Sequence, residues 1–154
     1  MQIEVLINGE KKHFNIEPGE TLLNLLRREG YYGVKRGCEE GYCGACTVIL
    51  NKKAVNSCLV FAAKAHQGEI TTIEGLGTPD NPHPLQEAFA QTGAVQCGFC
   101  TPGFILSAKA LLDENPDPSE EEVKTALDGN YCRCTGFVKP VKAVLSAAKK
   151  MRGE

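Results

Sequence analysis

The chain has 154 residues, enough for one ordinary domain or two small ones. Its formal net charge of -2 at pH 7 provides no excess of positive charge with which to bind nucleic acid or an anionic membrane surface. No segment approaches the run of about 20 apolar residues that a spanning helix requires, so we expect no membrane insertion. The amino terminus lacks the basic region and apolar core of a secretory signal, so we expect a cytoplasmic protein.

The chain opens with a predicted β-hairpin. In residues 2–8, Ile3, Val5 and Ile7 alternate with polar residues and share one side of a strand. The Asn8-Gly9 pair is a strong hairpin turn signal, and it precedes a second alternating run at 11–16. Phe14 and Ile16 of that run are expected to face inward with the first strand.

One helix and two more strands are predicted in the rest of the first half. Thr21 can cap a helix whose leucines recur at helical spacing before Gly30 stops it. The further predicted elements are a strand at 47–50, a turn at 51–53, a short helix at 59–63 and a strand at 70–73. A hairpin, a helix and returning strands predict an α+β unit, in which a mixed sheet wraps one helix.

A stretch rich in glycine and proline, residues 76–84, is predicted to be a linker between domains at 1–75 and 85–154. The second of these domains contains no convincing strand. Four helical segments are predicted there instead, at 85–91, at 104–113, after Ser119, and from Pro140 onward. Thr101-Pro102 is a capping residue followed by proline at the first helical position, and Ser119 with Glu122 fits a capping box.

Four of the eight cysteines form a group in the first half. They are Cys38, Cys43, Cys46 and Cys58. Three thiols spaced C-x4-C-x2-C on a glycine-rich loop, with a fourth supplied later, are typical of the plant-type ferredoxin site for a 2Fe-2S cluster. Gly37, Gly41 and Gly44 let the backbone pass close to such a cluster, because glycine has no side chain and reaches positive φ cheaply.

The other four cysteines form a second group, in the helical half. They are Cys97, Cys100, Cys132 and Cys134. A C-x2-C pair and a C-x-C pair, separated by 31 residues, lie at the ends of helical segments that can fold antiparallel and bring the thiols together. Cys100 precedes a helix amino terminus, where N–H groups and the dipole favour a thiolate cluster. Zinc also accepts four thiolates; its usual spacing differs, so the residues favour iron and leave zinc open.

No catalytic set is found among the remaining residues. His13, His66 and His83 are not beside the cysteine pairs, which argues against a Rieske centre, and we expect surface or loop roles for them. There is no Ser/His/Asp set, no phosphate loop and no dinucleotide-binding glycine pattern. Arg133, between two thiols, either offsets their clustered charge or is simply exposed. Electron transfer is therefore the role left for the chain.

Three motifs together resemble the iron-sulfur subunit of the molybdenum hydroxylases, the family of xanthine dehydrogenase and aldehyde oxidoreductase. They are GCEEGYCGACTV at 37–48, QCGFCTPG at 96–103 and GNYCRCTG at 129–136. The resemblance covers essentially the whole chain. It implies a β-grasp 2Fe-2S ferredoxin-like domain followed by an all-α four-helix 2Fe-2S-binding domain, with iron at the second site as well.

The resemblance also implies roles for particular residues. Cys38, Cys43, Cys46 and Cys58 would hold an outer cluster nearer a flavin, and Cys97, Cys100, Cys132 and Cys134 an inner one. Gln96 matches a glutamine that hydrogen-bonds the pterin of a molybdopterin-type cofactor, and Cys134 a ligand close to it. The chain would be the electron-transfer subunit of an oxidoreductase. Substrate chemistry would occur on a large molybdenum subunit, and electrons would pass through both clusters toward FAD on a medium subunit.

The sequence departs from the family pattern at Tyr42, at Tyr131 and at 137–140, which puts details of cluster potential and subunit contact in question. Two other functions compete with the leading one. A free-standing two-cluster ferredoxin would carry electrons between unrelated partners, although the long helical half and Gln96 argue against it. A zinc-stabilised interaction module would have no redox role.

Overall fold

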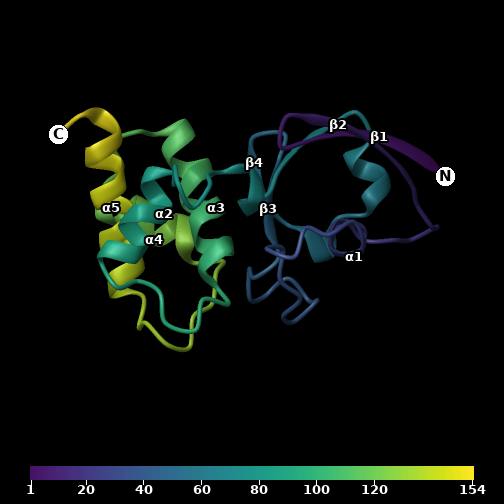
Figure 1. Ribbon diagram of the computed structural model, residues 1–154. Coiled ribbons are helices and arrows are strands. Elements are labelled where there is room, and N and C mark those ends of the chain that lie inside the picture. Colours follow the sequence, from purple (N-terminus) through teal and green to yellow (C-terminus); the bar gives the residue numbers. More distant parts are fainter.

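Two hydrophobic cores, each of 16 buried residues, divide the chain into two parts. The computed structural model describes all residues, 1–154. One part is a five-stranded sheet with helix α1, and the other is a group of four helices, α2 to α5, at its side (Figure 1). The predicted order of an α+β domain followed by an all-α domain is confirmed.

The amino-terminal hairpin forms as its turn signal predicts. β1 (Gln2–Ile7) pairs antiparallel with β2 (Glu10–Asn15). Asn8 and Gly9 between them have φ of 52° and 82°, the left-handed conformation that a two-residue hairpin turn requires. The apolar residues of β1 that face the core, Ile3, Val5 and Ile7, are 1% exposed, and their burial fixes which face of the hairpin points inward.

The sheet has the strand order β2-β1-β5-β3-β4. It includes β3 (Thr47–Leu50), β4 (Lys53–Asn56) and β5 (Glu69–Thr71). β1 and β5 pair in parallel at the centre, whereas the other pairs are antiparallel. Helix α1 (Leu22–Arg28) buries its four leucines under this sheet, and the Thr21 hydroxyl accepts the Asn24 N–H at 3.2 Å. This is the β-grasp arrangement.

The helical domain consists of α2 (Pro84–Gln91), α3 (Thr101–Glu114), α4 (Glu120–Leu127) and α5 (Val138–Arg152). Phe89 and Phe104 are its largest fully buried side chains. The predicted capping box is present at α4, where Ser119 and Glu122 bond to each other's backbone N–H groups. None of these helices combines the length and the apolar character that crossing a membrane would demand.

The structure differs from the sequence predictions at several element boundaries. β4 lies where no strand is predicted, because 53–56 has no apolar alternation. It pairs with the adjacent β3 through a turn at Asn51 and Lys52, whose φ values of 49° and 69° are those of a two-residue hairpin turn. The helix predicted at 59–63 is wrong: two 3₁₀ turns, Ser57–Leu59 and Ala62–Ala65, flank an extended Val60 and Phe61. That segment is held open by backbone bonds from Leu22 N–H to Val60 O and from Ala62 N–H to Glu20 O.

Two helices begin earlier than predicted. α3 starts at Thr101, with Cys100 as its N-cap, because Pro102 is tolerated anywhere in a first turn that lacks N–H partners. α5 starts at Val138, two residues before Pro140, because Phe137 reverses the chain in the left-handed region with φ of 67°. The linker at 76–84 and the domain boundaries beside it stay predictions.

The two domains meet where α3 packs against β3. This contact brings together the cysteine-bearing loops of both domains, which lie along the lower side of the molecule in Figure 1. The fold thus places two thiol-rich loops from distant parts of the sequence next to one another.

Candidate metal centres

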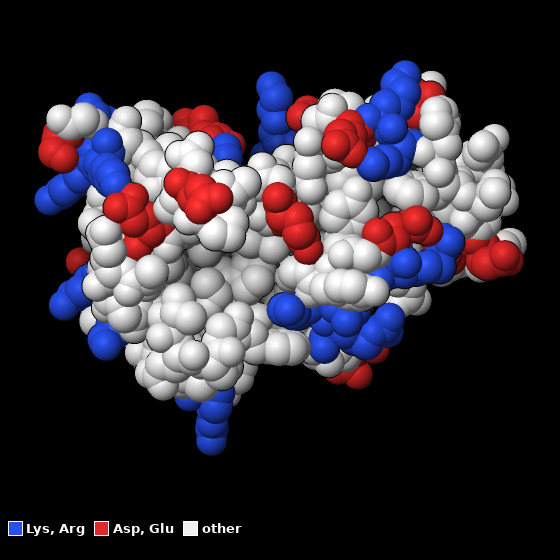
Figure 2. Space-filling view, viewed as in Figure 1, with Lys and Arg blue, Asp and Glu red and all other residues white.

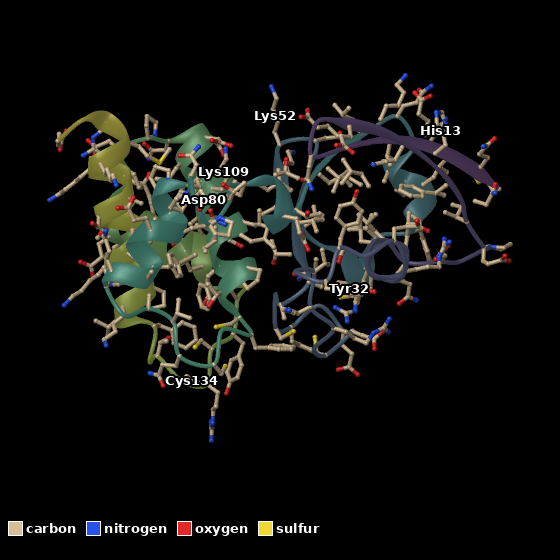
Figure 3. All side chains as sticks on the ribbon, in the orientation of Figure 1. His13, Tyr32, Lys52, Asp80, Lys109 and Cys134 are labelled. Atoms are coloured by element: carbon tan, nitrogen blue, oxygen red, sulfur yellow. The ribbon has the colours of Figure 1, made fainter.

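The first group of cysteines lies on the loop between α1 and β3 and on the 3₁₀ turn after β4. Cys38 and Cys43 are half-buried, whereas Cys46 and Cys58 are buried. Figure 3 shows two groups of sulfur atoms along the lower side of the molecule, one in each domain. The predicted set of four is therefore brought together from two separate segments of the first domain.

Glycine is required on this loop for two different reasons. A Cβ atom at Gly37 would lie 2.6 Å from the Cys43 sulfur, so any side chain there would occupy the space of the thiol. Gly44 has φ of +64°, and a Cβ atom on it would lie 2.3 Å from the Gly129 carbonyl oxygen. The first glycine keeps space for the thiols, and the second allows the other domain to approach.

The thiols of the first group differ in acidity because their surroundings differ. Backbone N–H groups of Glu40 and Cys43, each 3.4 Å from the Cys38 sulfur, lower the pKa of that thiol to about 7. Burial, with a hydrogen bond to Cys46, raises the pKa of Cys58 to about 11. A bound cation deprotonates a coordinating thiol outright. Iron bound at this group would therefore hold Cys58 as a thiolate despite its raised pKa.

The second group lies in the helical domain, on the loop before α3 and on the loop between α4 and α5. Cys97 and Cys134 are exposed, and their sulfurs are 3.8 Å apart. Cys100 is half-buried at the N-cap of α3, and its thiol hydrogen-bonds to the free thiol of the buried Cys132. Cys134 is labelled in Figure 3 at the lower edge of this domain.

Hydrogen bonds and burial also set the acidity of the second group. Burial, with the bond to Cys132, raises the pKa of Cys100 to about 12. Burial would also raise the pKa of Cys132, but the Thr135 hydroxyl and N–H, 3.0 and 3.4 Å from its sulfur, outweigh it and lower the pKa. The bond to Cys97 raises the pKa of Cys134.

The eight thiols are all free, and they approach one another in pairs. The pairs are Cys38 with Cys43, Cys46 with Cys58, Cys97 with Cys134, and Cys100 with Cys132. No group of three or more His, Cys, Asp or Glu side chains is spaced for a single metal ion. Two pairs in each domain fit a 2Fe-2S cluster, whose two irons together take four thiolates.

Gln96 lies beside the second group, as its place in the sequence predicts. Its side chain is exposed, and its Nε2 donates to the Cys134 carbonyl oxygen at 3.1 Å. The amide therefore ties the loop before α3 to the loop before α5. Arg133 is exposed, and an effect of its charge on the two neighbouring thiols stays a prediction.

The histidines lie outside both cysteine groups. His66 accepts the Glu4 N–H on Nδ1, and His83 caps α2 by accepting the Leu85 N–H on Nδ1 at 3.2 Å. Both interactions are local structural ones. The surface or loop roles predicted for these two residues are confirmed.

One residue beside the cysteines was missed by the sequence reasoning. Asn130 is part of the GNYCRCTG motif, but the sequence predicts no role for it; its side chain is 4% exposed and hydrogen-bonds to residues of both domains. A polar residue two positions before a cysteine pair is the only local signal for it, and that signal does not identify partners more than 80 residues away.

Two family models match successive parts of the chain. A "2Fe-2S iron-sulfur cluster binding domain" matches residues 5–71, and a "[2Fe-2S] binding domain" matches residues 72–145. The second match favours iron over zinc at the second group. Together with the paired thiols, these matches define a two-domain 2Fe-2S protein.

Named relatives specify the family. The nicotinate dehydrogenase small FeS subunit of Eubacterium barkeri is 50% identical over 149 residues, covering 96% of this chain and 95% of that relative. The solved aldehyde oxidoreductase of Desulfovibrio gigas superposes with a TM-score of 0.96 at 46% identity; the match covers 99% of this chain but 17% of that one. The solved quinoline 2-oxidoreductase of Pseudomonas putida 86 contains a chain of matching size, with a TM-score of 0.92 at 40% identity.

The chain belongs to the family of 2Fe-2S subunits of the molybdenum hydroxylases. Its relatives are either small subunits or much longer oxidoreductases that contain a matching portion, so this chain is an oxidoreductase component. The predicted class of protein is confirmed.

Proposed function

We propose that this chain is the electron-transfer subunit of a molybdenum-containing hydroxylase. It carries electrons from a molybdopterin site on a large partner subunit, through two 2Fe-2S clusters, to FAD on a medium partner subunit. The observation that carries the proposal is the adjacency of two four-thiol groups, joined by a backbone bond from Tyr131 N–H to Cys43 O at 2.8 Å. Relatives named as small subunits support the partner assignment.

The eight cysteines are the proposed iron ligands. Cys38, Cys43, Cys46 and Cys58 hold the outer cluster, and Cys97, Cys100, Cys132 and Cys134 hold the inner one. Each cluster, when bound, supplies a one-electron redox centre. The chain's own groups adjust the charge on the sulfurs: N–H donors from Glu40 and Cys43 stabilise the Cys38 thiolate, and the Thr135 donors stabilise that of Cys132.

The surface around the inner group supports docking to the large subunit. Val95, Phe99 and Tyr131 are 39%, 47% and 55% exposed beside the exposed Cys97 and Cys134. Figure 2 shows few charged side chains over the cysteine loops of the helical domain, at the lower left. An apolar face with exposed ligand sulfurs fits a partner that covers it and brings a cofactor close. Gln96 and Cys134 are the residues proposed to face the pterin.

A separate apolar surface surrounds the outer group. Tyr42, Leu59 and Phe61 are 77%, 64% and 58% exposed on or near the loops that bear Cys43 and Cys58. We assign this surface to the flavin subunit. The Tyr42 departure from the family pattern therefore falls in a proposed contact surface, as does the Tyr131 departure at the inner group.

The first test is purification of the native protein with its partners, together with iron analysis and electron paramagnetic resonance after dithionite reduction. The proposal predicts about four irons per chain and two distinct signals, with a large and a medium subunit in the same complex. Cys46→Ser and Cys132→Ser serve as each other's control, because each should remove one signal and keep the other. A chain that purifies alone with both clusters would identify a free-standing carrier.

The pterin-facing role has its own test. Gln96→Ala should weaken association with the large subunit and shift the potential of the inner cluster, while Gln91→Ala, an exposed glutamine on α2 that bonds only to Glu87, should change neither. Unchanged association and potential in both variants would contradict the role. The cytoplasmic location stays a prediction, which cell fractionation checks.

A further inference from the structure

A small polar cluster is buried between the two cysteine-bearing loops. The chain has five buried polar side chains, and three of them, Thr47, Ser107 and Asn130, meet at this one place. Thr47 lies at the end of the outer cysteine loop, Ser107 lies on α3, and Asn130 lies two residues before Cys132. Burying a polar group costs free energy unless a hydrogen-bond partner replaces the water that it loses, so three buried polar side chains at one place need an explanation.

Asn130 is the centre of this cluster. Its Nδ2 donates to Gly44 O at 3.1 Å and to Thr47 Oγ1 at 3.2 Å, and its Oδ1 accepts the Ser107 hydroxyl at 2.7 Å. The amide orientation is determined by the chemistry, because the Gly44 carbonyl can only accept. All three hydrogen bonds join residues far apart in sequence, and two of them cross from one domain to the other.

The backbones of the two domains also approach closely at this point. A Cβ atom on Gly103, in the first turn of α3, would lie 2.3 Å from the Gly44 carbonyl oxygen. Gly44 is enclosed on its other side by Gly129, whose carbonyl oxygen would lie 2.3 Å from a Cβ atom on Gly44. The residue after Cys43 is thus held between the helix that begins after Cys100 and the segment that leads to Cys132.

We propose that Asn130 is a positioning residue that fixes the separation of the two iron-sulfur clusters. It holds Gly44 against its own segment, which keeps Cys43 O at the Tyr131 N–H and the outer thiols at one distance from Cys132. Electron transfer between two centres slows steeply as their separation grows. A rigid contact through Thr47, Ser107 and Asn130, which we call the polar seam, therefore keeps the transfer rate constant. The inference rests on the proposed function, since it requires clusters at both groups.

A fully satisfied polar network suits this task better than an apolar contact would. Hydrogen bonds in a buried site have strict geometry and are strengthened by the low local dielectric, whereas apolar surfaces can slide past each other at little cost. No buried side-chain nitrogen or oxygen in the chain lacks a partner. The seam therefore specifies one relative placement of the two loops.

The experiment compares three variants of the full, iron-loaded chain. Asn130→Ala removes all three bonds, and Ser107→Ala removes only the bond to the amide oxygen of Asn130. Asn56→Ala is the matched control, because Asn56 Nδ2 also donates to a carbonyl of the outer loop, Gly41 O at 3.0 Å, but from within the same domain. Iron content establishes which samples hold both clusters.

The readout is the magnetic interaction between the two reduced clusters, seen as splitting of their signals or as faster relaxation of one spin when the other is reduced. Dipolar interaction falls with the cube of distance, so a small separation change is measurable. We expect the interaction to decrease in Asn130→Ala, to decrease less in Ser107→Ala, and to remain unchanged in Asn56→Ala, with the signal positions of each cluster retained. A role in stability alone would lower Tm and leave the interaction unchanged.

The possible outcomes separate the two proposals. Wild-type protein without two clusters would overturn the proposed function itself. Wild-type interaction retained in Asn130→Ala and Ser107→Ala, with both clusters present, would overturn the positioning role and leave the proposed function intact. If Asn130→Ala loses its iron, the magnetic interaction measured in Ser107→Ala tests the positioning role instead, because that variant keeps Asn130 and every cysteine.

Discussion

Replacing Gly103 with alanine tests how tightly the two domains are joined. Gly103 lies in the first turn of α3 with an ordinary helical φ, so alanine would normally favour the helix, by up to about 1 kcal/mol. Here the added Cβ atom would lie 2.3 Å from Gly44 O and 3.0 Å from Asn130 Nδ2. The Gly44 backbone cannot rotate away as a flexible side chain can, so the contact between the domains must open.

The expected cost depends on the size of this overlap. Inserting a methyl group into a well-packed interior costs about 1–3 kcal/mol. The overlap at Gly103 is with backbone, so the upper part of this range, about 2–3 kcal/mol, applies. Subtracting a helical gain of about 1 kcal/mol leaves a net loss of about 1–2 kcal/mol in the free energy of unfolding. For a chain of this length such a loss lowers Tm by about 2–8 °C.

The assay is thermal unfolding of wild type and variant at equal iron content, monitored by circular dichroism. Gly129→Ala is the matched control, because a Cβ atom there has no heavy atom within 4 Å and the residue has no positive φ. We expect this control to stay within about 0.5 kcal/mol of wild type. A Gly103→Ala protein that melts at or above the wild-type temperature would refute the close approach of the two domains.

Three further predictions concern the cysteine loops and the start of α2. Gly37→Ala should reduce the iron content to about half, because its Cβ atom would lie 2.6 Å from the Cys43 sulfur and only the first group would be lost; full iron would contradict this. Iron removal should lower the Tm of both domains, since metal binding contributes folding free energy, and an apo-protein that melts like the holo-protein would disprove it. Burial lowers the pKa of His83 below its ordinary 6.5, with Lys109 adding to the shift. Stability should therefore fall as pH drops below about 6.5, where the unfolded chain takes up a proton that the folded imidazole does not yet bind. His83→Asn keeps a capping acceptor and should show a shallower decrease, whereas identical pH profiles would exclude His83 as the cause.

Local signals in the sequence identified much of the fold because those elements are stabilised locally. The Asn8-Gly9 turn, the Thr21 cap and the Ser119 capping box each act within a few residues of themselves. The cysteine spacing was equally informative, since a cluster needs its ligands at set intervals. These features were predicted because their physical cause lies inside a short window of sequence.

Most of the parts that were missed depend on distant partners. β4 is the exception, because its partner β3 is adjacent in the chain and 53–56 simply lacks the apolar alternation that marks a strand. The extended Val60 and Phe61 are held by bonds to residues near 20, which no window around Cys58 contains. Asn130 is the clearest case, because Gly44 is 86 residues away and only the docked domains bring the two together.

The division into two cores has a consequence for how the protein is made. Each group of four thiols belongs entirely to one domain, and neither group includes a thiol from the other domain. A domain that emerges early during synthesis can therefore fold and receive its iron before the rest of the chain exists. We therefore expect biogenesis to consist of two separate cluster insertions followed by one docking event, in which the hydrogen bonds of Asn130 join the two domains.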